Sequence, residues 1–586
     1  MSLTPQLSNS KCGPHWRLRD WCAAAVLFAV TVGVVLWQNS RVTVLWDLSY
    51  ILENATRISQ GQLPYRDFPF PYAPLTFLTQ ASIIRLFGRV FWHHVAYAAV
   101  MGGVATVVAW RVLLRILYGR VQHAWTSALL LAMPCCVLGI YCIFPHPFYD
   151  PDCTLVMLLG TLALLRIEDD ELPVRSAPFI ARLTLLGTGA LLMLPVFIKQ
   201  NIGLIFTSAF IAVIVVEAVL AYKRGRRELA PRGTWIVCGA IISALVAAAL
   251  IAATVGFGNY LHWTVKFAAS RRMPAWHEMV GVYTNPALVL SLVLMGAGAG
   301  IAAFARRAWL RWFATALLTA PFLWSVIYLA LDSDVSERAE RLLAVWPPMI
   351  IASFVIAALG VRVQCGVRRW LPFVLLATIH AAFLSQQLWG STYALWPLLI
   401  LLIACMLSTL ADIAPRVHSL APSAVLLTTI ALLLAGTLYI RSEERLSYVS
   451  LEDGKLMHSS LPALRGIAMR GPWLPEFEEL VHYTEREIPR RDGVVMFPGE
   501  DLFYFTTGRS PQFPAVMFDH TVNPYDNAED LANAVRVRTN ISWIIVKREL
   551  QLQEEPMPQR QRVLDLLAPE FENVEKLDNY DVYRRK

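Results

Sequence analysis

Long apolar runs separated by short polar segments fill most of the first 440 residues. As helices, runs of about twenty apolar residues can cross the roughly 30 Å hydrocarbon core of a bilayer. The pattern therefore predicts a polytopic α-helical membrane protein with about thirteen transmembrane helices. These fall near residues 21–37, 91–112, 124–144, 153–167, 178–198, 203–222, 234–256, 286–304, 313–331, 343–361, 371–388, 394–411 and 420–440. Residues 75–87 are too few to cross, and they predict a shallow interfacial helix.

The pattern changes after residue 440, where charged and Pro-containing segments alternate with short apolar ones. Residues 441–586 therefore predict a separate soluble α/β domain. Within it we expect a helix opened by Pro475, another capped by Asn527 and Asp530, and strands at VVMFPG, FYFTTG and SWIIVK. The domain has no Gly-rich phosphate loop and no HExxH motif, which favours an acceptor-binding module or a lid over a catalytic module.

Basic residues predict the orientation of the helices. The densest runs are KRGRRELAPR at 223–232, ARRAWLRW at 305–312 and RVQCGVRRW at 362–370, all on the side that the N-terminus occupies. Because short cytoplasmic loops are rich in Lys and Arg, that side is predicted to be cytoplasmic. The chain then divides into a cytoplasmic tail (1–20), a transmembrane region (21–440) with a first outer loop (38–74), and an extracytoplasmic domain (441–586).

Composition supports this class of protein and excludes others. The chain has 586 residues, of which 56% are hydrophobic, and a mean hydropathy of +0.49. Its net charge of +8 does not indicate nucleic acid as a partner, because much of the positive charge lies in short loops between apolar runs. The nine cysteines lie mostly in or beside those runs, which indicates neither a disulfide framework nor a CxxC zinc site.

The first outer loop combines an amphipathic helix with a rigid polar segment. Between Asp47 and Gln60 the apolar residues recur at helical spacing, which predicts a helix lying on the membrane surface. A Pro-rich and aromatic run follows, and it holds Tyr65, Arg66 and Asp67 near the bilayer.

Three further outward segments collect polar residues. FPHPFYDPDC contains His146, Asp150 and Asp152, and the FIKQN turn contains Lys199. The fourth polar place, NYLHWTVKFAASRRMPAWHEM, brings together His262, Lys266, Arg271, Arg272 and His277 among aromatic residues. Carboxylates for proton transfer and cations for an anion are therefore predicted on one face of the membrane.

Together these features resemble the polyprenyl-phosphate-dependent membrane glycosyltransferases of the GT-C fold class. That class includes the protein O-mannosyltransferases and the aminoarabinose transferases acting on lipid A. The resemblance rests on an Asp after the first span, the amphipathic helix with GQLPYRDF, the acidic loop, the FIKQN turn and the C-terminal domain. Asp47 is followed by Leu48, where the protein mannosyltransferases carry Asp-Glu. This difference argues against a protein acceptor, and the GQLPYRDF form more closely resembles the bacterial branch that modifies lipids or glycans.

The resemblance implies transfer of a sugar from a polyprenyl-phosphate donor to a lipid, glycan or protein hydroxyl at the outer face of a bacterial inner membrane. It implies Asp47 as the general base, with Asp150 or Asp152 as a second acidic position. Lys199 with Arg271 or Arg272 suits the donor phosphate, and direct displacement would invert the anomeric configuration. A divalent cation could share that work, and no metal ligands are assigned.

Each of these residues also has a simpler structural interpretation. Asp47 could cap its helix, and Arg66 with Asp67 could form a surface pair. Asp150 and Asp152 could be turn residues, and Lys199 could be an interfacial anchor. The segment 262–277 could bind lipid headgroups in general. His146 and His262 could have structural roles.

Two other functions need a similar membrane region. A ligase that moves a whole glycan from its lipid carrier would share the chemistry. A transporter of lipid or sugar would place ionisable groups deep within its spans and repeat its halves. Acidic residues are nearly absent from the span centres here, and the sequence has no repeated half, so transfer is favoured.

Overall fold

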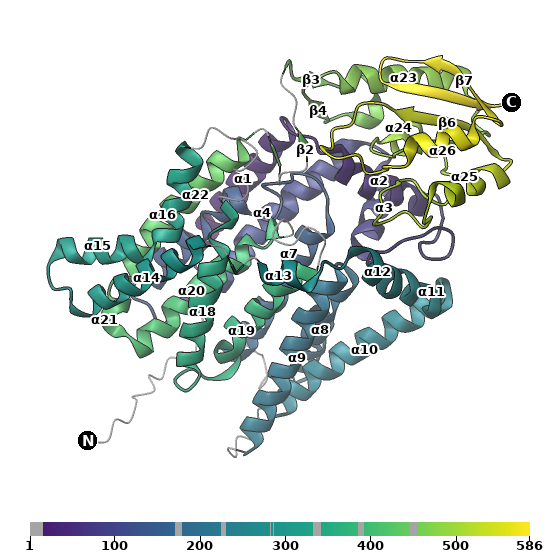
Figure 1. The fold of residues 1–586 in the computed structure, drawn as a ribbon. Coiled ribbons are helices and arrows are strands. Elements are labelled where there is room, and N and C mark those ends of the chain that lie inside the picture. The colour runs from purple at the N-terminus through teal and green to yellow at the C-terminus, as the bar shows by residue number, and fades with distance from the viewer. Residues whose placement is uncertain are drawn as a thin grey trace.

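The computed structural model describes residues 16–169, 178–223, 230–281, 283–284, 286–331, 342–384, 392–442, 444–445, 449–450 and 454–586. Most of the predicted tail, residues 1–15, lies outside the described residues. A long helical region occupies one side of the molecule, and a small sheet with its helices lies at the other end (Figure 1).

Within the described ranges, nine helices are long and apolar enough to cross a membrane. Most of their exposed surface is hydrocarbon, which suits lipid and not water. The helices that form these spans are α1 (Leu18–Asn39), α4 (Phe91–Leu117), α8 (Pro178–Met193), α9 (Gln200–Lys223), α10 (Ala230–Thr254), α14 (Pro286–Phe304), α19 (Gly366–His380), α20 (Trp396–Ile413) and α22 (Ala421–Ile440).

The other four predicted spans are also helical, but they are shorter, bent or more polar. The structure adds a tenth span if α15 and α16, which meet at 71°, cross together. The elements concerned are α5 (Ala124–Ala132) with α6 (Cys135–Leu138), α7 (Tyr149–Glu168), α15 (Ala308–Leu318) with α16 (Ala320–Leu331), and α18 (Trp346–Gly360).

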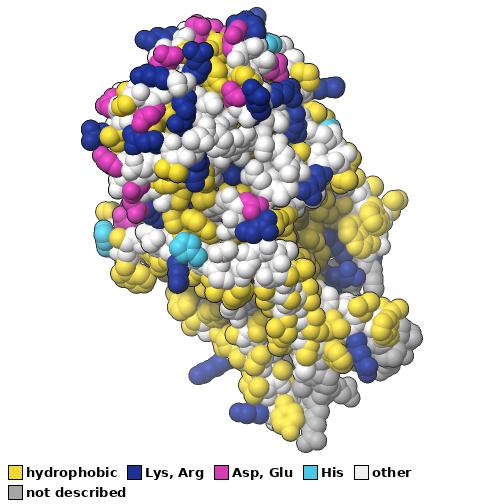
Figure 2. Space-filling model, turned by 90° about the vertical axis from the view of Figure 1, so that its right-hand side faces the viewer, with side chains coloured by type: hydrophobic (Ala, Val, Ile, Leu, Met, Phe, Trp, Pro, Cys, Tyr) yellow, Lys and Arg dark blue, Asp and Glu magenta, His cyan; other side chains and the backbone are white. Residues whose placement is uncertain are grey.

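The surface of the helical region is apolar where lipid would meet it. Large side chains such as Leu245 and Leu250 on α10 and Val293 on α14 are about 60% exposed. Figure 2 shows hydrophobic side chains over the lower part of the molecule and charged side chains gathered at the opposite end. Because so large an apolar surface would be unfavourable in water, the chain is an integral membrane protein.

Residues 454–586, here called the C-terminal unit, build a four-stranded sheet in the order β5-β6-β8-β7. β5 is parallel to β6, and the other neighbours are antiparallel. The strands are β5 (Gly493–Phe497), β6 (Ile541–Lys547), β7 (Phe571–Lys576) and β8 (Tyr580–Arg585). The helices are α23 (Trp473–Glu487), α24 (Phe503–Thr507), α25 (Ala528–Val537) and α26 (Arg560–Leu567). Two-residue strands pair before them: β1 (Glu444–Arg445) with β2 (Val449–Ser450), and β3 (Met457–His458) with β4 (Ala468–Met469).

Local predictions in the C-terminal unit have mixed outcomes. SWIIVK forms the buried strand β6, and the side chain of Asn527 accepts a hydrogen bond from the backbone N–H of Asp530 at the start of α25. The predicted strand at FYFTTG is wrong, because these residues form the helix α24. A carboxylate from another part of the chain accepts hydrogen bonds from the backbone at the start of that helix, which stabilises it.

That carboxylate belongs to Glu53 on α2 (Leu45–Ser59), the amphipathic helix of the first loop. Glu53 accepts hydrogen bonds from the backbone N–H groups of Tyr504 and Phe505 at 3.0–3.2 Å. The prediction that α2 lies on the membrane surface is wrong, since its polar face is buried against the C-terminal unit. α3 (Leu75–Phe87) spans the residues predicted for a short helix, and it packs against α2.

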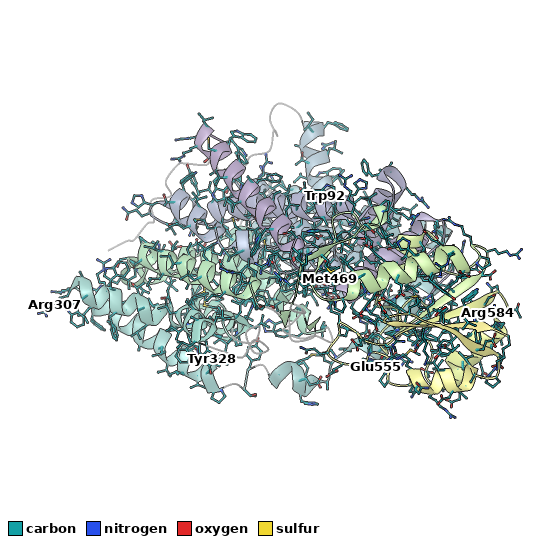
Figure 3. The ribbon with its side chains drawn as sticks, turned by 90° about the horizontal axis from the view of Figure 1, so that it is seen from above. Trp92, Arg307, Tyr328, Met469, Glu555 and Arg584 are labelled. Atoms are coloured by element: carbon teal, nitrogen blue, oxygen red, sulfur yellow. The ribbon has the colours of Figure 1, made fainter. Side chains whose placement is uncertain are left out.

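Hydrogen bonds also join the C-terminal unit to the ends of the membrane helices. Asn39, at the end of α1, donates to the carbonyl of Gly466, and Thr43 donates to that of Ala468. In Figure 3 Met469 lies between the helices and the sheet, whereas Arg307 lies at the end of the helical region opposite to Arg584. The basic run 305–312 is thus remote from the C-terminal unit.

Candidate active site

A cleft of about 540 Å³ lies where α2, α7 and the helix α12 (Ala268–Arg272) meet the C-terminal unit. The first-loop helix, Tyr72, the start of α7, Lys199 and α12 form its walls. Segments of the C-terminal unit between 517–522 and between 552–558 cover it. Four residues that the sequence singled out line it together: Asp47, Asp150, Lys199 and Arg272. They come from four segments that are far apart in the chain.

Asp47 lies in the first turn of α2 and is half-buried at the cleft wall. Val44, and not Asp47, occupies the N-cap position, so the interpretation of Asp47 as a simple helix cap is wrong. A carboxylate in the first turn is still favoured by the helix dipole, which stabilises its ionised form. The position therefore suits a base that must be charged before it accepts a proton.

Asp150 and Lys199 form a buried ion pair in the cleft. Asp150 lies in the first turn of α7, and Lys199 lies between the short 3-10 helix η1 (Leu194–Phe197) and α9. The Lys199 ammonium group donates to the Asp150 carboxylate. Both side chains are more than 90% buried, so the contact is not a solvent-exposed pair. An ammonium group has three N–H donors, which leaves two for another anion in the cleft.

Arg272 approaches the same place from α12. Its guanidinium carbon lies 4.3 Å from the ring centroid of Tyr72, and the Lys199 ammonium lies 5.4 Å from that of Tyr149. Rings beneath cations stabilise the positive charge and limit the motion of the long side chains. The two cations are thus held against an aromatic wall that limits where they can lie in the cleft.

Arg271, the neighbour of Arg272, points elsewhere. It pairs with Asp526, whose side chain is 76% exposed, and it lines a separate groove with His262, Lys266 and Trp263. The sequence offered both arginines for the donor phosphate, and the structure brings only Arg272 into the cleft. The basic segment is also helical, with a π-helical turn at His262–Phe267 and then α12.

Asp152 lies outside the cleft lining. Its carboxylate accepts hydrogen bonds from Thr76 at 2.7 Å, Tyr97 at 2.8 Å and Tyr141 at 2.5 Å. These three donors come from α3, α4 and the loop before α7, so Asp152 connects parts of the fold. The structure thus distinguishes Asp150, at the cleft, from Asp152, behind it.

Tyr65, Arg66 and Asp67 support the first loop without lining the cleft. The Tyr65 hydroxyl donates to the backbone carbonyl of Tyr72, one of the cleft residues, at 2.6 Å. Arg66 and Asp67 form an exposed pair, and Asp67 accepts from the backbone N–H of Leu63. The hydrogen bond from Arg66 lowers the pKa of Asp67 below its usual value.

Gln200 fixes the relative positions of three segments beside the cleft. Its amide donates to the carbonyls of Pro71 and Thr264, and it accepts from the N–H of Ala73. The FIKQN turn, the 69–73 run and the π-helical turn are therefore tied together.

The sequence did not indicate the residues that the C-terminal unit adds to the cleft. Asp519, His520, Glu554 and Glu555 line it, although they lie hundreds of residues after Asp47. Figure 3 shows Glu555 at the side of the unit away from Arg584. Their contribution to the cleft follows only from the tertiary structure.

Among the described residues, no group of three or more His, Cys, Asp or Glu side chains is arranged to hold a metal ion. His146 is buried with its ring 5.8 Å from that of Phe144, and burial lowers its pKa to about 3. His262 lies in the groove of Arg271. Neither histidine lines the cleft.

No family model matches the chain, and no curated protein matches it. Among solved structures, the chain is similar to ArnT from Cupriavidus metallidurans in the apo state. The TM-score is 0.47 and the sequence identity 12%, over 96% of this chain and 98% of ArnT. ArnT bound to undecaprenyl phosphate gives a TM-score of 0.45 at 12% identity, over 97% and 98% of the two chains.

A second similar structure is the apo oligosaccharyltransferase of Archaeoglobus fulgidus. The TM-score is 0.46 at 12% identity, over 90% of this chain and 69% of that one. The same archaeal protein has a structure in complex with an inhibitory peptide and a dolichol-phosphate, with a TM-score of 0.46 at 11% identity.

Proposed function

We propose that the protein is a membrane glycosyltransferase of the GT-C type that moves a sugar from a polyprenyl phosphate to a hydroxyl group. The observation that carries this proposal is the convergence of Asp47, Lys199 and Arg272 on one cleft. Among the residues that line the cleft, these three match a reaction that removes a proton from an acceptor and releases a phosphate from a donor.

In the proposed reaction the acceptor oxygen attacks the anomeric carbon of the sugar. Asp47 takes the proton of the acceptor hydroxyl as the new carbon–oxygen bond forms. The bond between the sugar and the phosphate breaks, and its electron pair leaves with the polyprenyl phosphate. Lys199 and Arg272 stabilise the charge that develops there, and a single displacement inverts the anomeric configuration.

Asp150 has a positioning role in this proposal. Its contact with the Lys199 ammonium holds that group at the cleft and balances its charge while the site is empty. A donor phosphate then bonds the remaining N–H groups. Asp152 is assigned a structural role because both of its carboxylate oxygens already accept hydrogen bonds from hydroxyl groups.

The position of the cleft also suits a donor that comes from the lipid bilayer and an acceptor that comes from the aqueous solution. The wall of the cleft includes the start of α7 and Lys199, which lies immediately before the membrane-spanning helix α9. Its roof belongs to the C-terminal unit, which carries most of the charge on the face that Figure 2 shows. A lipid donor can therefore enter from the bilayer and a polar acceptor from water. We place residues 441–586, as an extracytoplasmic domain, on the acceptor side, at the outer face of a bacterial inner membrane.

The test uses purified protein in proteoliposomes with a polyprenyl-phosphate donor labelled in its sugar. A transferase releases sugar-free polyprenyl phosphate in step with labelled product, whereas a transporter moves the donor unchanged. Arg272→Ala should reduce release at least tenfold, and Arg271→Ala, whose side chain lies outside the cleft, should change it less than threefold. Equal effects of the two substitutions would contradict the proposed site.

A further inference from the structure

Tyr50 lies on α2 three residues after Asp47, and residues at that spacing share one face of a helix. Its side chain lines the cleft and also a smaller side pocket. Only 6% of the residue is exposed. Within the described part of the chain, its hydroxyl has no hydrogen-bond partner.

A buried hydroxyl without a partner is unfavourable, because folding removes its bonds to water and returns none. Phenylalanine would fill the same space without that penalty. The Tyr50 side chain also borders two cavities and is not enclosed wholly within a packed core. This combination points to a partner that arrives with the substrate.

The surroundings of Tyr50 indicate the chemistry of that partner. Its ring centroid is 4.4 Å from that of Tyr72 and 6.4 Å from that of Tyr149, so three aromatic rings form one wall. Lys199 and Arg272 lie against the two other rings and not against Tyr50. Tyr50 thus adds a neutral side chain to the wall whose other two rings contact the cations, and it lies one helical turn from the proposed base.

A sugar ring fits such a position. In the proposed reaction the sugar must lie between the acceptor at Asp47 and the phosphate at the cations. Its C–H faces can pack on aromatic rings, and its hydroxyl groups can bond a phenolic hydroxyl that both donates and accepts.

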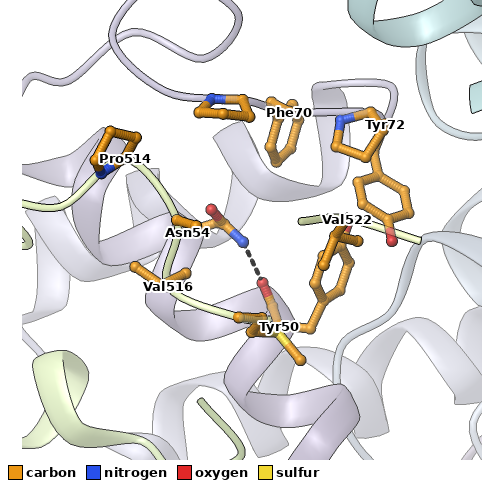
Figure 4. A pocket seen from close by; sticks show the side chains of 11 residues that line it. Tyr50, Asn54, Phe70, Tyr72, Pro514, Val516 and Val522 are labelled. Carbon is orange, nitrogen blue, oxygen red and sulfur yellow. Dashed lines mark hydrogen bonds between the residues drawn. The ribbon is translucent and has the colours of Figure 1, made fainter. Parts of the chain in front are cut away.

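The side pocket limits the size of the sugar substituent that could lie beside Tyr50. It shares Tyr50, Tyr72, Met517 and Val522 with the cleft, and Asn54 supplies a second polar group to its lining. Figure 4 shows Tyr50 and Tyr72 on one side of this pocket, across from Pro514, with the Asn54 amide donating to the Tyr50 carbonyl. Its volume of about 20 Å³ holds a group of about the size of one water molecule.

We propose that Tyr50 is a sugar-contacting residue, whose hydroxyl bonds a hydroxyl of the transferred sugar and whose side pocket receives one small polar substituent. This proposal rests on the proposed function, since it assigns the sugar position within the same cleft. It makes the wall of Tyr50, Tyr72 and Tyr149 the part of the site that distinguishes a sugar-bearing lipid from a bare lipid phosphate.

The test compares Tyr50→Phe with the control Tyr504→Phe. Tyr504 is also a buried tyrosine, but its hydroxyl donates to the backbone carbonyl of Val494 and does not line the cleft. Each full-length protein is purified from the membranes of the producing cell. Mass spectrometry then measures the ratio of sugar-bearing to sugar-free polyprenyl phosphate that co-purifies, and the melting temperature of each protein is recorded.

We expect this ratio to fall about tenfold in Tyr50→Phe, as the loss of one buried hydrogen bond to a ligand predicts. Its melting temperature should equal or exceed that of the wild type, while Tyr504→Phe should keep the wild-type ratio and melt at a lower temperature. An unchanged ratio in Tyr50→Phe overturns the inference, as does a Tyr50→Phe protein that fails to fold, because its hydroxyl would then be structural. A wild type that holds only sugar-free polyprenyl phosphate also overturns it. A wild type that holds no polyprenyl phosphate at all contradicts the proposed function itself.

Discussion

Asp150 and Asp152 lie two residues apart in the first turn of α7, yet they face different surroundings. Residues two positions apart in an α-helix are separated by about 200° around its axis, so their side chains point to nearly opposite sides. Asp150 meets a cation at the cleft, and Asp152 meets three hydroxyl groups behind it. The two aspartates can therefore have different roles although they lie close together in the sequence.

Substitution of these two aspartates should separate the roles. Asp152→Ala leaves its buried hydroxyl partners without an acceptor, which should lower the free energy of unfolding by about 1–3 kcal/mol for each group left unsatisfied. The folded fraction should keep transfer within threefold of the wild type. Asp150→Asn should fold normally and lose at least tenfold in kcat/KM. Thermal melting and transfer rates measured on the same preparations check both, and a reversed pattern would refute the assignment.

Lys199→Gln tests the phosphate role of the buried ammonium group. The substitution removes a positive charge from the cleft, so the KM for the lipid donor should rise at least tenfold. The KM for the acceptor should change less than twofold. Steady-state kinetics with each substrate varied in turn measure this difference, and an unchanged donor KM and kcat would exclude Lys199 from phosphate binding.

At the scale of elements, α2 is the helix on which the site depends. Hydrogen bonds with the C-terminal unit hold it along its length: through Gln551 at its start, through Ser49 and Glu53 further along, and through Arg57 near its end. Burial raises the pKa of Glu53 well above its usual range. The helix that carries Asp47 is therefore positioned by the unit that also covers the cleft.

Gln551→Ala should reveal this positioning. The Gln551 amide accepts from the Leu45 N–H and donates to the Thr43 carbonyl, both at 2.8 Å, immediately before Asp47. Without these bonds the first turn of α2 is less fixed, so kcat should fall about tenfold because small misplacements of a reacting group slow the reaction strongly. Donor affinity should stay within twofold. The exposed Gln561 on α26 provides the control, since Gln561→Ala should alter neither quantity; a fall in donor affinity alone would argue against positioning.

The sequence predicted the helices and strands better than it predicted the tertiary contacts between them. Apolar runs and the N-cap at Asn527 are local signals, and the helices and α25 lie where they indicate. The helix at FYFTTG depends on Glu53, some 450 residues earlier, so no local signal could reveal it. The buried polar face of α2 and the orientation of Arg272 away from Arg271 also depend on tertiary contacts. The sequence thus indicated part of the candidate site, including Asp47, Lys199 and Arg272, but neither the residues that the C-terminal unit adds to the cleft nor the geometry.

At the scale of the whole molecule, the two ends differ in character. On the face that Figure 2 shows, charged side chains gather at the end formed by the C-terminal unit, and hydrophobic side chains cover the rest. Arg307, in the basic run 305–312, lies at the end opposite to Arg584 (Figure 3). This arrangement agrees with basic loops in the cytoplasm and a C-terminal unit outside it.

Thiol labelling of intact spheroplasts tests that orientation. Residues after 405 contain no cysteine, and Asn573 is exposed on β7. A membrane-impermeant maleimide should therefore label Asn573→Cys from outside. The native Cys365, exposed in the basic run 362–370, should react only after the membrane is permeabilised. Labelling of Cys365 and not of residue 573 in intact cells would reverse the topology.

The most direct measurement of the central claim is the single-turnover rate of sugar transfer by Asp47→Asn with saturating donor and acceptor. Loss of a general base should slow this rate about 10²-fold or more. The amide has nearly the same shape as the carboxylate, so membrane insertion, melting temperature and bound polyprenyl phosphate should match the wild type. A rate above about one tenth of the wild-type value, measured on folded and donor-loaded protein, would contradict the account.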